Sequence, residues 1–138
     1  MKLLKTALVA LACLLSASAF AQRALVPIVD YKDVTVASSS GKPLTAEQVR
    51  EAIAVGGRKL GWDMGATADG GLVGTLNVRN KHIISVEIKV APERYSVFYR
   101  SSSNMKYRVD GAGAVIHPAY NQWVQNLVTM IDSELRKL

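Results

Sequence analysis

The sequence predicts an α+β fold, in which an antiparallel sheet of about four strands has two helices packed on one face, in the order α-β-β-β-β-α. Three observations predict it: a helical apolar period over residues 45–60, alternation of apolar and polar residues over 62–99, and a second helical period after Pro118. One apolar and one polar face per strand is typical of a sheet that is covered on a single side. We therefore expect residues 45–138 to form a single α+β domain.

The start of the chain has the composition of a cleavable signal peptide. Two lysines precede an apolar run over Thr6–Leu15, and Ala19-Phe20-Ala21 fits the small-x-small pattern of a cleavage site. The apolar run is too short to span a membrane, which takes about 20 residues. Residues 1–21 are therefore a predicted signal peptide, and we expect an exported, periplasmic protein that begins near Gln22.

The single cysteine, Cys13, lies within this leader. An alternative is an outer-membrane lipoprotein in which Cys13 is acylated after cleavage at Ala12, although the preceding residues fit a lipobox only loosely. If the whole leader is removed, the mature chain has no thiol, and it can form neither a disulfide nor a thiolate metal site. The fold then depends on its apolar core alone.

The charge balance favours anionic partners. Of the 17 Lys and Arg residues two lie in the leader, and against 11 Asp and Glu residues the mature chain carries a net charge of about +4. The basic residues are scattered, without the dense run of a nucleic-acid-binding arm, and nucleic acid is not an expected partner. An envelope protein, an anionic envelope component and peripheral contact with a membrane all remain open, and the oligomeric state is not indicated.

Residues 22–44 are expected to form an extended N-terminal segment. Pro27 has no amide hydrogen, which confines any strand around it to the edge of a sheet. Val34-Thr35-Val36 is compatible with a short strand, and the composition of Ser38–Pro43 is that of a loop.

The first helix has a clear start, because Thr45 and Gln48 have the spacing of a capping box. Its apolar stripe is Val49, Ala52, Ile53, Gly56 and Leu60. Gly56 and Gly57 each weaken a helix by about 1 kcal/mol relative to alanine. Their presence predicts that the helix approaches the sheet closely at this point.

The strands follow as alternating runs separated by turn sequences. The predicted inward residues are Trp62, Met64 and Ala66, then Leu72, Gly74, Leu76 and Val78, then Ile84, Val86, Ile88 and Val90, and finally Tyr95, Val97 and Tyr99. Asp69-Gly70-Gly71, Asn80-Lys81 and Ala91-Pro92-Glu93 are the predicted turns. The alternation ends at Arg100, where we expect the sheet to give way to a glycine-containing link.

The last helix is expected to open at Pro118, a favoured first-turn residue, and to run to the C-terminus. Its apolar stripe is Tyr120, Trp123, Val124, Leu127, Ile131 and Leu135. The spacing is that of an amphipathic helix with one buried face.

Polar side chains are concentrated where the last strand leads to this helix, and they are the candidate ligand-binding residues: Ser102, Asn104, Tyr107, His117, Tyr120 and Asn121, with Asn126 nearby. One interpretation is structural, since Asn and Ser satisfy backbone groups in tight connections and His117 can cap the helix beside Pro118. The other is a shallow polar pocket rimmed by aromatic residues. We also expect Asn104 and Asn121 to face each other, and His82 and Trp62 to pack in the core.

The same stretch resembles a family of small uncharacterised exported proteins and lipoproteins of Gram-negative bacteria. The resemblance rests on Ser102-x-Asn104-x-x-Tyr107 followed by Ile116-His117-x-x-Tyr120-Asn121-x-Trp123-Val124-x-Asn126-Leu127, and covers roughly residues 45–131. Members of that family often carry an acid where this chain has Ser101. The resemblance implies compartment and fold, but no activity.

No standard catalytic signature is present: the chain has no Walker loop, GxSxG elbow, HExxH helix or Cys–His pair after the leader. No catalytic residue, metal site or cofactor is therefore predicted. The leading hypothesis is a non-enzymatic periplasmic binding or interaction module. The alternatives are a hydrolase or transferase with His117 as general base, and a surface-exposed factor that binds an anionic membrane or polyanion.

Overall fold

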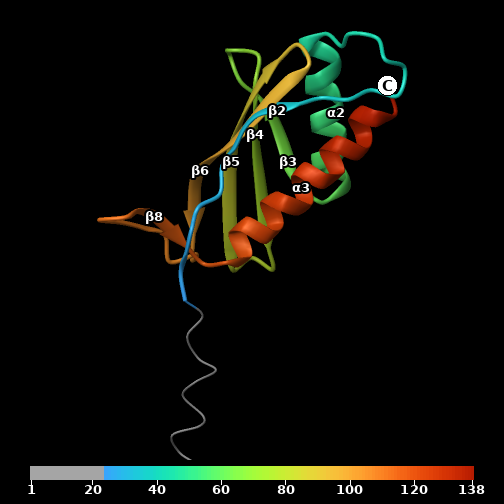
Figure 1. Cartoon of the computed structure of the whole chain (residues 1–138). Coiled ribbons are helices and arrows are strands. Elements are labelled where there is room, and N and C mark those ends of the chain that lie inside the picture. Colours follow the sequence, from blue (N-terminus) through green and yellow to red (C-terminus); the bar gives the residue numbers. More distant parts are fainter. Residues whose placement is uncertain (1–23) are drawn as a thin grey trace, which may run out of the picture.

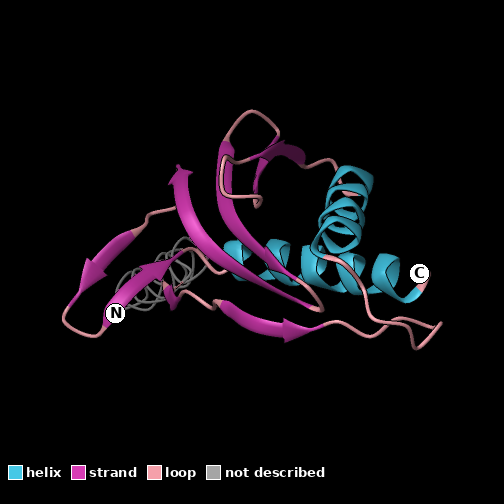
Figure 2. Ribbon diagram, turned by 90° about the horizontal axis from the view of Figure 1, so that it is seen from above, coloured by secondary structure: helices cyan, strands magenta, loops and turns pink. Residues whose placement is uncertain are grey.

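The computed structural model describes residues 24–138, so the predicted signal peptide and the Cys13 alternative lie outside the described residues. Within that range the fold is α+β, as predicted, with helices α2 (Ala46–Lys59) and α3 (Ala119–Arg136). The main sheet holds β2 (Tyr31–Thr35), β3 (Asp63–Ala66), β4 (Leu72–Val78), β5 (His82–Ala91) and β6 (Arg94–Ser103) in the antiparallel order β2-β6-β5-β4-β3. Both helices cover one face of this sheet (Figures 1 and 2).

The core lies between that face and the two helices. Of the predicted inward residues, those at the centre of the sheet, among them Ile84, Val86, Tyr95 and Val97, are buried, which confirms the predicted alternation there. Towards the ends of the strands the predicted inward residues Leu76, Val78, Val90 and Tyr99 are only partly buried, and Ala66 is exposed. The buried residues share one cluster with the apolar stripes of the helices, of which only Leu60 and Trp123 are partly exposed. Trp62 is buried in this cluster, as expected.

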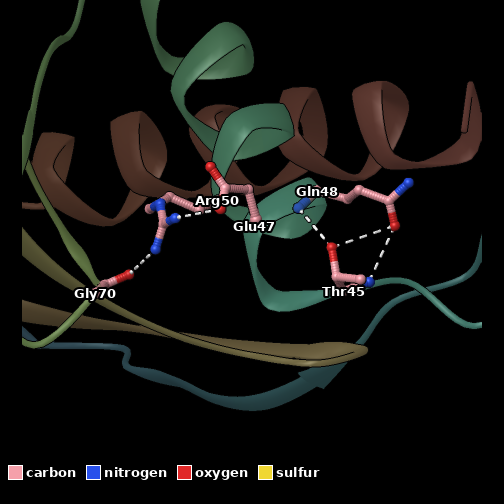
Figure 3. A network of polar contacts seen from close by, with 5 residues as sticks. All are labelled: Thr45, Glu47, Gln48, Arg50 and Gly70. Atoms are coloured by element: carbon pink, nitrogen blue, oxygen red, sulfur yellow. Dashed lines mark hydrogen bonds and ion pairs between the residues drawn. The ribbon is translucent and has the colours of Figure 1, made fainter.

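Helix α2 begins with the predicted capping box. The Thr45 hydroxyl accepts the backbone N–H of Gln48 at 3.2 Å, and the Gln48 side chain accepts the N–H of Thr45 at 3.0 Å (Figure 3). One turn later Arg50 pairs with Glu47 at 3.4 Å and donates to the carbonyl of Gly70 at 3.0 Å. The capping box thus satisfies the amides of Thr45 and Gln48, and the Arg50 side chain connects the helix to the β3–β4 turn.

The two helical glycines permit close packing, but against two different neighbours. A Cβ on Gly56 would lie 3.3 Å from the backbone of Ile131 in α3, and one on Gly57 would lie 2.5 Å from the sulfur of Met64 in β3. The predicted approach to the sheet is thus made by Gly57, while Gly56 lets the two helices approach each other. Lys59 of α2 reinforces that helix contact by donating to Glu134 of α3 at 2.5 Å, and Lys137 at the end of α3 donates to the same carboxylate at 3.0 Å.

The prediction of one sheet with about four strands is wrong in number. β2, from the N-terminal segment, pairs with β6 and adds a fifth strand to the main sheet. β1 (Val26–Pro27), β7 (Arg108–Asp110) and β8 (Gly113–Ile116) form a second sheet in the order β1-β8-β7. These strands are too short to show a period of two, and β1 and β8 are distant in sequence, so no local pattern could reveal them. Pro27 does lie in an edge strand, as predicted.

The apparent break of pattern at Arg100 is a β-bulge and not the end of the strand. Val86 pairs with Tyr99 and Ser85 pairs with Ser101, which leaves Arg100 without a partner on β5. The extra residue shifts the alternation by one position, so that β6 continues to Ser103 with the opposite parity. Within residues 24–138 no helix is both long and apolar enough to cross a membrane.

Candidate functional site

A cleft of about 340 Å³ opens at the end of the main sheet where β5 begins and β6 ends. The β4–β5 turn, the link after β6 and the first turn of α3 meet there. Its lining residues are Val78, Arg79, Lys81, His82, Met105, His117, Ala119 and Trp123. We call it the histidine cleft, because His82 and His117 stack with ring centroids 6.5 Å apart.

The β4–β5 turn gives the cleft its positive charge. Val78 pairs with His82, so the turn is a three-residue loop over residues 79–81, in which Arg79 and Asn80 adopt left-handed φ values of 56° and 55° and the N–H of Lys81 donates to the carbonyl of Val78 at 3.0 Å. Asn77 accepts the backbone N–H of Asn80 at 3.0 Å and stabilises this conformation. The turn predicted at Asn80-Lys81 lies within this loop, which begins one residue earlier, and the loop places both Arg79 and Lys81 against the cleft.

His82 is held in one tautomer by its link to the chain after β6. Its Nδ1 lies 2.8 Å from the backbone carbonyl of Asn104. A carbonyl oxygen can only accept, so Nδ1 carries the hydrogen and Nε2 of the neutral ring carries a lone pair. Nε2 of His82 is therefore the atom of the neutral ring that can accept a hydrogen bond from a ligand.

His117 is held in the opposite tautomer. Its Nδ1 accepts the backbone N–H of Ala119 at 3.0 Å, so Nε2 carries the hydrogen when the ring is neutral. This bond caps α3, as expected for His117, and the N–H of His117 donates to the carbonyl of Met105 at 2.9 Å. In the hydrolase alternative the general base would then more readily be His82 than His117.

The electrostatic character of the cleft is set by cations without local counter-charges. Among the described residues, neither Arg79 nor Lys81 has a carboxylate oxygen within 4.0 Å. Trp123, with its ring 6.2 Å from that of His82, adds a partly exposed indole wall. A hollow with two cations, two imidazoles and one indole has the chemistry to bind an anionic group attached to an apolar or planar body.

The six predicted ligand-binding residues separate into three groups. His117 lines the histidine cleft, and Asn104 lies behind its lining and bonds to two of the lining residues. The Asn104 side chain donates to the carbonyl of Lys81 at 3.0 Å, and so joins the link after β6 to the β4–β5 turn. Asn104 therefore positions the cleft residues Lys81 and His82 through its side chain and its backbone, respectively.

Ser102, Tyr107 and Tyr120 surround Tyr99 instead. The ring of Tyr107 stacks on that of Tyr99 at 4.4 Å, Tyr120 meets it edge-on at 5.6 Å, and the hydroxyls of Tyr99 and Ser102 lie 2.9 Å apart. Tyr120 is buried, and burial raises the pKa of its phenol above the ordinary value. This is an aromatic packing cluster, with only Tyr107 substantially exposed.

Asn121 holds the N-terminal segment in place. Its side-chain oxygen accepts the N–H of Val29 at 3.1 Å, and its amide donates to the carbonyl of Pro27 at 2.9 Å. Asn104 and Asn121 thus bond to different segments and not to each other, while Asn126 accepts from Gln122 at 2.9 Å on the exposed side of α3.

The sequence interpretation left Arg79, Lys81 and Trp123 out of the site and placed His82 in the core. The available signal was the predicted turn itself, since a basic hairpin turn directly before a histidine projects from the end of a sheet. Among residues 24–138, no three His, Cys, Asp or Glu side chains converge as metal ligands would.

No protein-family model, curated protein or solved structure matches this chain. The family resemblance therefore stays a prediction that rests on the residues of the chain alone.

Proposed function

We propose that this chain is a non-enzymatic binding module of the cell envelope that takes an anionic group in the histidine cleft. The observation that carries the proposal is the pair Arg79 and Lys81, which line a hollow of about 340 Å³ without an ion-pair partner among the described residues. Phosphate or carboxylate oxygens accept charge-assisted hydrogen bonds from such groups. The envelope location depends on the predicted signal peptide.

The geometry of the cleft is fixed by bonds to the backbone, so a ligand can bind without breaking them. His82 and His117 each bond to the backbone through Nδ1, so the orientation of both rings is fixed by the chain itself and needs no anion. Trp123 supplies an apolar surface beside the charges. A phosphate carried by a lipid headgroup or by a polymer fits this combination of charge and apolar wall better than a free ion does.

The test is a titration of the purified protein with inorganic phosphate at low ionic strength, followed by tryptophan fluorescence. Arg79→Ala and Lys81→Ala should each raise the dissociation constant by about threefold to thirtyfold, as expected for the loss of one charge-assisted hydrogen bond. Lys89→Ala, which removes an exposed lysine of β5 outside the cleft, is the matched control and should bind as the wild type does. Trp123→Phe should abolish the fluorescence change, because Trp62 is buried in the core.

Vesicles of phosphatidylglycerol and of phosphatidylcholine then distinguish a lipid phosphate from a free one. Binding to the anionic vesicles that depends on Arg79 and Lys81 would assign the site to a lipid headgroup. An unchanged fluorescence with every probe, or equal weakening by Lys89→Ala, would overturn the proposal.

A further inference from the structure

The β7–β8 hairpin projects from the body of the molecule at the end where the histidine cleft lies (Figure 1). β7 is the outer strand of the small sheet, and all three of its residues, Arg108, Val109 and Asp110, are exposed. Val109 is 69% exposed, which is the highest value among the large hydrophobic residues in the described range 24–138. An open strand edge with an exposed apolar centre is a template for pairing with another strand.

The backbone groups of Val109 point to this open edge. Val109 is paired with Ala114 of β8, and the carbonyl of Ala114 accepts the N–H of Ile28 at 3.2 Å on the opposite side of β8. In an antiparallel ladder the N–H and C=O of one residue point to the same side, and hydrogen-bonded pairs alternate with non-hydrogen-bonded pairs. Val109 and Ala114 are therefore a non-hydrogen-bonded pair, and the N–H and C=O of Val109 face away from β8.

We propose that β7 pairs with β7 of a second copy of this chain, in an antiparallel arrangement centred on Val109. In that register the two Val109 residues lie opposite each other and exchange both backbone hydrogen bonds. Arg108 then lies opposite Asp110 of the second copy, and Asp110 lies opposite its Arg108. The sequence Arg-Val-Asp is thus complementary in charge to itself when it runs antiparallel, which is the requirement of a two-fold interface.

The charge pattern decides between this occupant and others. A parallel neighbour, or a register shifted by two residues, would not bring both opposite-charge pairs together. Charged residues can also protect an edge strand from pairing, but two charges of the same sign would do this equally well. Protection alone therefore does not explain the opposite signs of Arg108 and Asp110. The dimer would join the two small sheets into one sheet in the order β1-β8-β7-β7-β8-β1, and this pairing is independent of anion binding in the cleft.

The test is the self-association of the protein, expressed from its full sequence and purified in the form that the cell produces, measured by sedimentation from about 10 µM to about 1 mM. We expect a reversible dimer with a dissociation constant on the order of 100 µM, since a single short strand buries much less than a stable interface does. Arg108→Asp and Asp110→Arg each place like charges opposite each other twice and should weaken association at least about tenfold. Arg94→Asp, at the opposite end of β6, is the matched control and should dimerise as the wild type does.

The decisive experiment mixes the two single variants. A chain with Asp at 108 and 110 faces a chain with Arg at both positions, so the mixture should form a heterodimer at concentrations where each variant alone is mostly monomeric. Both side chains are exposed, but the Asp110 carboxylate also accepts the N–H of Ala112 at 2.9 Å within the hairpin turn, so circular dichroism checks that each variant is folded. A wild-type protein that stays monomeric over this range, or a mixture that fails to associate, would overturn the proposal.

Discussion

The substitution Asn104→Ala tests whether the polar residues after β6 serve the fold or a ligand. Asn104 has a left-handed φ of 59°, and its side chain donates to the carbonyl of Lys81 at 3.0 Å. Alanine would lose this exposed hydrogen bond, which contributes about 0.5–1 kcal/mol. It would also tolerate the left-handed backbone less well than asparagine, at about 1 kcal/mol.

The expected loss is thus about 2 kcal/mol in the free energy of unfolding, or a melting temperature about 6–8 °C lower for a domain of this size. Asn104→Gly separates the two effects, because glycine loses the bond but adopts a left-handed φ freely. We expect its melting temperature to lie at least about 4 °C above that of Asn104→Ala. The measurement is thermal unfolding by circular dichroism at matched concentrations.

The same pair of variants also separates folding from binding. Both substitutions keep the backbone carbonyl to which His82 bonds and both remove the side-chain bond to Lys81, so any change in phosphate affinity should be the same in the two folded variants, whereas their melting temperatures differ. An alanine variant as stable as the wild type, or a glycine variant as unstable as the alanine one, would refute this account of Asn104.

Three further predictions concern packing, pH and processing. Gly57→Ala should lower the free energy of unfolding by about 1–3 kcal/mol, because its Cβ would lie 2.5 Å from the Met64 sulfur. Chemical denaturation measures this loss, and adding the second substitution Met64→Ala should reduce it. Hydrogen bonds from Lys59 and Lys137 hold the pKa of Glu134 below its ordinary value. The ionised Glu134 carboxylate therefore stabilises the fold above about pH 4.3, and this stabilisation is lost as the pH falls through the lower pKa that Glu134 has in the folded protein. The difference in melting temperature between the wild type and Glu134→Gln should therefore shrink on acidification, and a difference that grows would contradict it. Intact-mass analysis of the exported protein should give a chain that begins at Gln22, whereas a lipid-modified cysteine at the N-terminus would support the lipoprotein alternative.

Local signals predicted much of this fold. The capping box at Thr45, the hairpin turn before His82 and the alternation along β5 each depend on residues within a few positions of one another, and the structure contains all three. The helix starts near Pro118 for the same reason, and His117 caps it as expected.

The candidate site was predicted only in part, because its residues come together through distant pairings. His117 lines the cleft and Asn104 bonds to its lining residues, but Tyr107 and Tyr120 pack on Tyr99. Asn121 holds a segment 92 residues earlier in the chain, a contact that no pattern around Asn121 could indicate. The sequence interpretation grouped these residues by their position along the chain, whereas the bulge at Arg100 and the β7–β8 hairpin send them to different places.

The sequence by itself determined the α+β class, the two amphipathic helices, the turns and the apolar face of each long strand, since these follow from periodicity and from short-range hydrogen bonds. Only the tertiary structure decided that β2 joins β6, that β1 pairs with β8, and that Arg79 and Lys81 meet two histidines. Pairings of that kind depend on which distant surfaces can bury one another and complete their backbone hydrogen bonds. The packing of the whole chain decides these pairings, because short strands such as β1 and β7 have no local preference strong enough to specify their partners.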